Sequence, residues 1–367
     1  MRFLHLVNAG FAGGVLRVVY EQAIHLKKLG YESMVVAGFP VSIFPGFPYV
    51  NTNFKLYFYP KFCSNTFIRV PLRAITELLP LRISYRPDWI IVHNFSFIRD
   101  AFKLREKFGS KLAILLHNFT VPTIIGDYLA HKTGLDKILL NKSHTILSNS
   151  DIVLTTSEKM RKMIREFYDV DSVVLPLGAR VPSKVPSKRS GFVLFAARIS
   201  SGKKADVVAR IMSLVDGDVE TIFAGSSSYT MPLVLRKIRK SGLRRYTIIP
   251  NITDHALNKL YDLCGAFISV NDEPFGLNIV EAAAHGAPIC ANAASGAAEL
   301  FEDGVHGYFI KHYGKDVPVE EYAKRIEKLI GNEKVAYEMG YNAWKLLREK
   351  YTWTHHVMRL VSLLNAY

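Results

Sequence analysis

Two glutamates, Glu273 and Glu281, lie eight positions apart in the segment EPFGLNIVEAAAHG. The apolar segment AFISV before them predicts a buried strand, which Pro274 and Gly276 would end, and a helix is expected to begin near Leu277 or Asn278. The amides and the dipole of a helix N-terminus suit an anion such as a diphosphate. Because Gly276 has no side chain, a ligand could approach its backbone closely.

The two carboxylates could then contact different parts of one ligand. Glu281 would lie about one turn into the helix, where an ionised carboxylate can accept hydrogen bonds from the two vicinal hydroxyls of a ribose. Glu273 would lie at the strand end, where it can contact a second polyol such as a sugar. Two glutamates alone are more often solvated surface side chains, so this interpretation depends on the neighbouring FGL and HGAP segments.

Two cations follow another apolar strand, in the segment LFAARISSGKKAD. The strand is expected to end at Arg198, and Lys203 follows five residues later, beyond a Ser-Ser-Gly turn. Two cations at a strand end can hold the phosphates of a ligand. A solvated basic turn explains the same residues equally well, because Lys and Arg are common in surface loops.

Three further features could carry chemistry. His93 and His117 follow the apolar segments WIIV and LAILL, so both are expected to face a crevice, where either could bind a sugar hydroxyl, transfer a proton or be a structural histidine. The glycine-rich segment 8–14, NAGFAGG, is an anion cradle or a tight turn. The triplet DGD at 216–218 resembles a metal-binding motif, but its position between a helix and a strand favours a turn.

Short apolar segments alternate with helical periodicity along the whole chain, which predicts an α/β protein with two Rossmann-like, doubly wound parallel sheets. Open sheets of this kind bind ligands at the carboxyl ends of their strands, so both halves are expected to face one central cleft. The segment 181–190 is rich in Pro, Ser and Lys and is interpreted as a linker. The strands are expected at 2–7, 33–38, 89–94, 111–119, 151–157 and 172–178 before the linker, and at 192–198, 219–225, 246–252, 266–270 and 288–293 after it.

Composition narrows the class of protein. A chain of 367 residues with 49% apolar residues is long enough for two domains. The net charge is +15, and residues 1–180 carry 23 Lys and Arg against 13 Asp and Glu. Such a charge implies an anionic partner: a nucleic acid, a membrane surface or a phosphorylated small molecule. The three cysteines, Cys63, Cys264 and Cys290, are far apart, which favours a reducing, cytoplasmic compartment.

The segment 39–62 is rich in Phe, Tyr and Pro and poor in acidic residues. It could be a loop that faces an acceptor or a membrane, or an insertion that packs on its own domain. No apolar segment reaches the length that a membrane span needs.

Together these segments resemble the retaining glycosyltransferases of family 4, which have the two-domain GT-B fold. The marker is the E-x7-E pattern, followed here by HGAPICAN and SGAAE. NAGFAGG is similar to the glycine loop of that family, LLHN to its strand ending in a histidine, and RISSGKK to its arginine-to-lysine donor motif. The last segment, KYTWTHHVMRLV, resembles a terminal helix that crosses back onto the first domain.

The resemblance implies an acceptor-side domain at 1–180 with the helix 352–367 packed on it, a linker at 181–190 and a nucleotide-sugar domain at 191–351. In the second domain, Arg198 and Lys203 would hold the donor diphosphate and Glu281 the ribose. The transferred sugar and the distal phosphate would be held by Glu273 and by the backbone of Phe275, Gly276 and Leu277.

The remaining implied contacts come from three other segments. Gly13 and Gly14 would approach the reaction centre from the first domain, and His117 would contact the donor sugar near the bond that is transferred. Asn251 would contact the base through its backbone. The family pattern is broken at three positions: Lys204 replaces a glycine, Ser295 replaces the first of two glycines, and Asn118 stands where an aspartate often follows the histidine.

The implied reaction moves a sugar from a UDP- or GDP-sugar to a hydroxyl of a glycan, lipid or small molecule, with retention and without a metal or other cofactor. The basic first domain would allow peripheral contact with the inner face of an anionic membrane. Two other interpretations stay open: a nucleotide-sugar epimerase or phosphorylase of the same fold, and a non-catalytic basic protein that binds an anionic surface or nucleic acid. No specific nucleic-acid partner is expected, because the motifs lie at strand ends rather than along a basic stripe.

Overall fold

A computed structural model describes residues 1–7, 14–38, 55–59, 81, 83–118, 136–228, 230–314 and 316–367 of the chain. For 55–59 only the backbone is described. The chain divides into two compact units. Unit 1 comprises residues 1–177 and 353–367, and unit 2 comprises residues 178–352.

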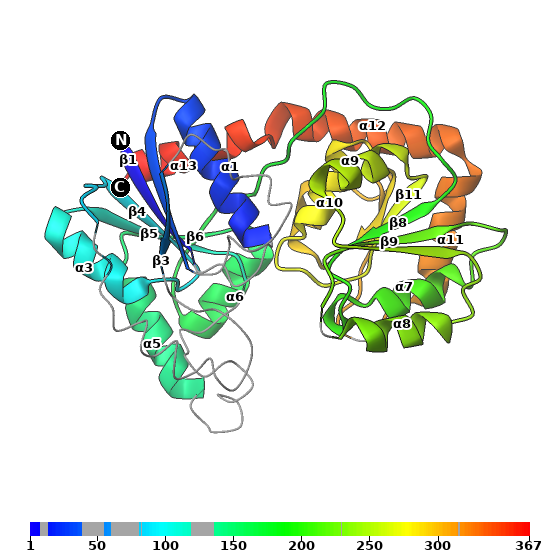
Figure 1. The fold of residues 1–367 in the computed structure, drawn as a ribbon, viewed down its shortest axis with the longest axis horizontal. Helices are drawn as coiled ribbons and strands as arrows, with labels where there is room; N and C mark the ends of the chain where they lie inside the picture. Colours follow the sequence, from blue (N-terminus) through cyan, green and yellow to red (C-terminus); the bar gives the residue numbers. More distant parts are fainter. Residues whose placement is uncertain are drawn as a thin grey trace. The chain divides into compact units, whose positions relative to one another are not determined.

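Unit 1 is built on a parallel sheet with the strand order β3-β2-β1-β4-β5-β6-β7 (Figure 1). The chain extends the sheet from β1 to β3 in one direction and then returns to the other side of β1 with β4, so the winding direction switches between β1 and β4. Its strands are β1 (Arg2–Val7), β2 (Glu32–Gly38), β3 (Lys55–Tyr59), β4 (Trp89–His93), β5 (Lys111–Leu116), β6 (Ile152–Thr155) and β7 (Val173–Val174). Its helices are α1 (Gly14–Lys28), α3 (Ile98–Phe108), α5 (Asp136–Ser148), α6 (Glu158–Tyr168) and α13 (Trp353–Asn365).

Helices cover both faces of this sheet, which is why its central strands are apolar without alternation. On one face, Phe3 and Ile91 of the sheet pack with Val357 of α13 in a buried cluster. On the other face, Leu4 packs in a cluster that includes Ile164 of α6. The C-terminal helix α13, red in Figure 1, is therefore part of the core of unit 1.

Unit 2 repeats this plan with the strand order β10-β9-β8-β11-β12-β13. Its strands are β8 (Val193–Ala196), β9 (Thr221–Gly225), β10 (Tyr246–Pro250), β11 (Ala266–Ser269), β12 (Ile289–Asn292) and β13 (Tyr308–Ile310). Its α-helices are α7 (Ala205–Met212), α8 (Met231–Arg239), α9 (Asp254–Leu263), α10 (Leu277–Ala284), α11 (Val319–Gly331) and α12 (Glu333–Lys350). Here the winding switches between β8 and β11.

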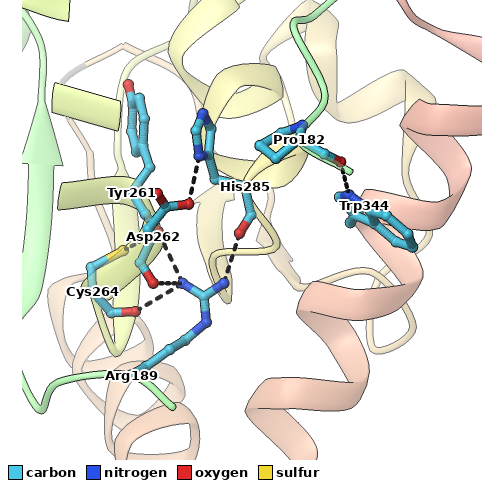
Figure 2. A network of polar contacts seen from close by, with 7 residues as sticks. All are labelled: Pro182, Arg189, Tyr261, Asp262, Cys264, His285 and Trp344. Atoms are coloured by element: carbon cyan, nitrogen blue, oxygen red, sulfur yellow. Dashed lines mark hydrogen bonds and ion pairs between the residues drawn. The ribbon is translucent and has the colours of Figure 1, made fainter. Parts of the chain in front are cut away.

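The segment 181–190 contains neither helix nor strand, yet it is tied closely to unit 2 (Figure 2). The indole Nε1 of Trp344 donates to the carbonyl oxygen of Pro182 at 2.9 Å. The guanidinium of Arg189 donates to the carbonyl oxygen of His285 at 2.7 Å. The same guanidinium also donates to the carbonyl oxygens of Tyr261, Asp262 and Cys264.

Burial lowers the pKa of Arg189 below its ordinary value, and charge-assisted bonds to four carbonyls compensate for the loss of water. Arg189 thus joins the end of α9 to the end of α10. The Pro- and Ser-rich composition indicated irregular backbone, but it did not reveal this anchoring.

The two doubly wound parallel sheets confirm the predicted fold class. In the part of the chain that the structure describes, no helix is long and apolar enough to cross a membrane. The DGD triplet forms a turn in which Gly217 has φ of 89°, and the carboxylate of Asp218 accepts from Arg245 at 2.7 Å.

Candidate functional site

The switch between β8 and β11 in unit 2 brings two predicted site residues into contact. Lys203 lies in the loop after β8, and Glu273 lies in the loop after β11. The Nζ of Lys203 donates to Oε1 of Glu273 at 2.5 Å, and the two side chains are 35% and 18% exposed. A cation and an anion therefore meet at the carboxyl ends of the central strands, where open α/β sheets bind ligands.

Ser295 holds the loop that carries Glu273 through two hydrogen bonds to its backbone. The Oγ of Ser295 donates to the carbonyl oxygen of Asn271 at 2.8 Å and accepts from the backbone N–H of Glu273 at 3.2 Å. The side-chain amide of Asn271 donates to Oε1 of Glu273 at 3.2 Å. A glycine at 295, as the family pattern has, could make neither side-chain bond. The sequence showed Ser295 only as a departure and did not indicate this role.

The helix α10 begins at Leu277, as the sequence predicted, and its N-cap is Gly276 with φ of 100°. Only glycine adopts this conformation readily. The first turn of α10 contains no acidic residue, so no carboxylate in that turn offsets the positive end of the helix dipole. The side-chain amide of Asn278 donates to the carbonyl oxygen of Ala196 at 2.9 Å, which fixes the helix start against the end of β8. Glu281 lies half-buried one turn further along.

Phe275 and Arg198 occupy different environments at the same edge of the sheet. Phe275 is buried, and its carbonyl oxygen accepts from the N–H of Ala297 at 2.5 Å. Arg198 is exposed just beyond β8. Its neighbour Ala197 lies so close to Gly225 of β9 that a Cβ on that glycine would be 1.9 Å from the carbonyl oxygen of Ala197. The loop with Arg198 therefore requires glycine at the end of β9.

Asn251, at the end of β10, has φ of 55° and is exposed. Its Oδ1 accepts from the N–H of Ser227 at 2.9 Å, so it holds the turn that follows β9. It lies two strands from β8, or about 10 Å at the usual strand spacing. Asn251 follows β10 and Glu273 follows β11, so the two residues lie apart along this edge of the sheet rather than in a compact cluster.

Lys204 stands at a position where the family pattern has glycine, and its backbone conformation accounts for that pattern. Its φ of 54° is left-handed, a conformation in which glycine has no steric cost. Lys204 instead donates from Nζ to the carbonyl oxygen of Gly314 at 2.5 Å, and burial lowers its pKa.

In unit 1, the predicted residue His117 comes directly after β5 and is linked to a row of buried histidines. Its Nε2 lies 2.8 Å from Nδ1 of His93, and Nε2 of His93 lies 3.2 Å from Nδ1 of His5. The rings of His93 and His117 are stacked, with centroids 5.1 Å apart. Three strands, β1, β4 and β5, thus supply one hydrogen-bonded chain at the point where the winding switches.

Burial lowers the pKa of both His5 and His117 to about 3. Burial also holds the pKa of His93 well below its ordinary value, assisted by the neighbouring His117. All three imidazoles are therefore neutral near pH 7. The expectation that His93 faces a crevice is wrong, since its side chain is fully buried and both nitrogens are bonded. His5 was not predicted, although it is the one polar residue within the apolar segment FLHLV of β1.

The C-terminal helix adds a fourth buried histidine to unit 1. Nδ1 of His356 donates to the carbonyl oxygen of Pro176 at 2.7 Å, and its Nε2 lies 2.9 Å from the amide nitrogen of Gln22. A carbonyl can only accept and an amide nitrogen can only donate, so His356 carries its proton on Nδ1. Burial lowers its pKa to about 4.

Some predicted positions fall outside the described residues. These are Gly13, Cys63 and the segment 39–62 apart from the backbone of β3. Gly14 is described and is the exposed first residue of α1. Among the described residues, no three His, Cys, Asp or Glu side chains are grouped as metal ligands.

Two doubly wound units of this kind, with a lysine and a glutamate meeting at the switch point of the second, define a GT-B protein. Residues 12–180 match the family model described as Glycosyltransferase Family 4, and residues 181–346 match the model described as Glycosyl transferases group 1. The chain belongs to the glycosyltransferases of family 4.

Solved structures show the same fold. Sucrose-phosphate synthase of Thermosynechococcus elongatus superimposes with a TM-score of 0.78 at 16% identity, covering 100% of this chain and 99% of that one. HepE of Anabaena, in a complex with UDP and glucose, gives a TM-score of 0.77 at 17% identity and covers 100% of both chains.

Curated relatives match over shorter lengths. Sucrose synthase 1 of Hordeum vulgare is 33% identical over 107 residues, which is 29% of this chain and 13% of the relative. Sucrose synthase of Acidithiobacillus caldus is 30% identical over 95 residues, 26% of this chain and 12% of the relative. The match thus spans about an eighth of the length of these relatives.

Proposed function

We propose that this chain is a retaining glycosyltransferase that moves a sugar from a nucleotide diphosphate sugar to an acceptor hydroxyl. The observation that carries the proposal is the contact between Lys203 and Glu273 at the switch point of unit 2, beside the N-terminus of α10. Cations and helix amides suit a diphosphate, and the carboxylate suits sugar hydroxyls. UDP is the favoured nucleotide, because the structurally similar HepE has been solved with UDP and glucose.

In this proposal the residues of unit 2 hold the donor and stabilise its leaving group. Arg198, Lys203 and the first amides of α10 would stabilise the charge that develops on the departing diphosphate. Glu281 would accept hydrogen bonds from the ribose, and Glu273 from the transferred sugar. The hydrogen bond from Lys203 holds the carboxylate of Glu273 in place at this edge of the sheet.

The proposed chemistry is a front-face transfer. The bond between the anomeric carbon and the leaving phosphate oxygen breaks, and the acceptor oxygen bonds to the same face of that carbon. The leaving phosphate would take the acceptor proton, so no protein nucleophile is needed. The two cations fill the role that a metal has in other transferases, so we propose that neither a metal nor another cofactor is required.

The first test is ligand-induced stabilisation without metal, using UDP, GDP, ADP and their sugars. A ligand at 100 times its Kd should stabilise the folded state by about 2.7 kcal/mol. UDP and UDP-sugars are expected to raise the melting temperature of the parent. Glu281→Ala should weaken UDP binding by roughly 10- to 100-fold, because a hydrogen-bonded charged group is worth about 1.5–3 kcal/mol. Glu338→Ala, at an exposed position of α12, is the matched control and should bind as the parent does.

Glu273 is tested separately through turnover. Glu273→Ala should lower kcat by on the order of 100-fold while UDP affinity stays close to that of the parent, because its proposed contact is to the sugar. Equal turnover in the variant and the parent would remove Glu273 from the site. NMR of the product would show whether the anomeric configuration is kept. If no nucleotide stabilises the parent, a basic binding protein on this fold becomes the better interpretation, and a new sugar nucleotide as product would indicate an epimerase.

We also propose that unit 1 contacts an anionic membrane and that the protein works peripherally at the cytoplasmic face. The helix α6 supports this, because it exposes Arg161, Lys162, Arg165 and Phe167, together with one acid, Glu166, while Met160 is buried. Arg161 forms an ion pair with Glu158, and Arg165 forms one with Asp171. These pairs weaken the attraction of the two arginines to an anionic membrane.

Vesicle binding tests the membrane contact. The protein should co-sediment with vesicles containing anionic lipid at low salt and remain in the supernatant with neutral vesicles. Each Lys or Arg near the surface contributes about 1 kcal/mol, so Lys162→Glu should weaken binding by about tenfold or more. Lys345→Glu, at an exposed position of unit 2, makes the same change of net charge and should bind as the parent does. Absence from the anionic pellet at low salt would reject the membrane contact.

A further inference from the structure

The chain of histidines in unit 1 has one buried end and one end at the carboxyl edge of its own sheet. At the buried end, Nε2 of His5 has no hydrogen-bond partner among the residues that the structure describes. At the other end, His117 is 8% exposed and directly follows the carboxyl end of β5. Its Nε2 is bonded to His93, so Nδ1 is the nitrogen that it can offer to a ligand.

Neutral imidazoles allow only two arrangements of protons in this chain. Each neutral ring has one N–H group and one bare nitrogen. Each hydrogen bond between two rings therefore joins the N–H group of one ring to the bare nitrogen of the other. In the first arrangement, His5 donates from Nδ1 to His93, and His93 donates from Nδ1 to His117. His117 then carries its proton on Nδ1. In the second arrangement every proton lies on Nε2, and Nδ1 of His117 is a bare acceptor.

The buried end of the chain distinguishes the two arrangements. The first leaves a bare lone pair on Nε2 of His5, and the second leaves an N–H group there. An unpaired buried N–H group is rarer in proteins than an under-satisfied buried acceptor. The first arrangement, which leaves Nε2 of His5 as a bare acceptor, is therefore favoured.

We propose that His5 and His93 are positioning residues that set the tautomer of His117, so that His117 presents an Nδ1–H donor to an oxygen of the donor substrate. This inference rests on the proposed function of the same protein. It gives His117 a definite chemical role: a neutral hydrogen-bond donor to a sugar or phosphate oxygen, and not a general base, because its Nδ1 already holds a proton.

The surroundings are consistent with this neutral chain. On α13, His356 is neutral and is locked in the Nδ1–H form by Pro176 and Gln22. A proton on His356 or on any member of the chain would repel charge on the others, and burial lowers the pKa of each. Four imidazoles from β1, β4, the end of β5 and α13 thus stay uncharged together.

The direct test is the tautomer itself, read by long-range ¹H–¹⁵N correlation of the full chain labelled with ¹⁵N-histidine at pH 7.5. The His117 signals are assigned by their loss in His117→Gln. A protonated Nδ1 and a bare Nε2 on His117 are the expected result. A protonated Nε2 on His117 would overturn the proposal, whether or not the protein turns over any sugar nucleotide.

Two substitutions of His93 test the coupling to activity. His93→Leu breaks the chain and should lower kcat with UDP-sugar by about tenfold, the equivalent of one hydrogen bond of about 1.4 kcal/mol. UDP affinity should not change, since the nucleotide is proposed to bind unit 2. His93→Gln keeps an acceptor and a donor amide in the same order, so it should restore the Nδ1–H signal of His117 and most of kcat.

Controls separate this proposal from folding and from the proposed function. His255→Gln changes an exposed histidine of unit 2 and should behave as the parent. Equal loss of kcat in His93→Gln and His93→Leu, with melting temperatures near that of the parent, would contradict a role through the tautomer. Absence of turnover in the parent, combined with the expected tautomer, would reject the proposed reaction and leave the proton arrangement established.

Discussion

Lowering the pH from 7 to 5 is expected to destabilise unit 1 by roughly 6–8 kcal/mol, which equals the whole free energy of unfolding of a domain at the lower end of the usual range. The cause is the four buried neutral histidines, His5, His93, His117 and His356. Burial lowers the pKa of His5 and His117 to about 3 and the pKa of His356 to about 4. Burial also lowers the pKa of His93.

The sign follows from proton binding. In the unfolded chain each histidine has a pKa near 6.5 and takes up a proton as the pH falls below that value. In the folded unit these four imidazoles take up no proton until the pH approaches 4, so their contribution to stability falls between pH 6.5 and pH 4. Each group contributes about 1.36 kcal/mol per pH unit in that window, or about 2 kcal/mol between pH 7 and pH 5.

Calorimetry at pH 7.5, 6.5 and 5.5 is the measurement, with unit 1 and unit 2 followed as separate transitions. The unit 1 transition should shift steeply to lower temperature as the pH falls. His5→Leu should reduce the steepness by about one proton, while the exposed His255→Gln should leave it unchanged. A unit 1 transition at the same temperature at pH 7.5 and pH 5.5 would show that these imidazoles do not titrate as their burial requires.

The second large effect is expected from a single methyl group in unit 2. Gly340 of α12 lies against the turn that ends α10, and a Cβ on Gly340 would be 2.0 Å from the carbonyl oxygen of Gly286. The contacted atom belongs to the backbone. Gly286 cannot easily move away, because its own Cβ position is already 2.6 Å from Val185. Gly340→Ala should therefore destabilise unit 2 by about 3 kcal/mol or more.

A thermal melt tests this prediction, since about 3 kcal/mol lowers the melting temperature of a domain of this size by roughly 6–12 °C. Gly331→Ala is the matched control. Gly331 ends the neighbouring helix α11, and nothing lies within 4 Å of its Cβ position, so alanine should be neutral or slightly stabilising. Equal melting temperatures for the two variants would show that α12 can shift away from α10 at little cost.

The sequence was most informative where one strand or helix carried the whole signal. Continuous apolar segments located eleven strands of the two sheets to within a few residues, because strands buried on both faces lack alternation. The start of α10 was predicted to within one residue from Pro274 and Gly276. The short strands β3 and β13 were missed, since three to five residues at a sheet edge carry little periodicity.

The parts that could not be predicted depend on contacts between distant segments. The bond between Lys203 and Glu273 joins loops 70 positions apart, and spacing along the chain does not report it. The histidine chain joins β1, β4 and β5, so no single segment shows that His93 is a buried link. The roles of Ser295 and Arg189 are likewise set by the carbonyl groups of other segments.

The connectivity of unit 1 has a consequence for synthesis of the protein. Unit 1 is interrupted by residues 178–352 and completed only by residues 353–367. At 5–20 residues per second, a ribosome needs roughly 10–35 s to make the intervening segment. During that time the sheet face around Phe3 and Ile91 lacks its covering helix, whereas unit 2 is contiguous and can close as soon as Thr352 emerges. The N-terminal half of the nascent chain is therefore expected to fold last and to need the protection of a chaperone.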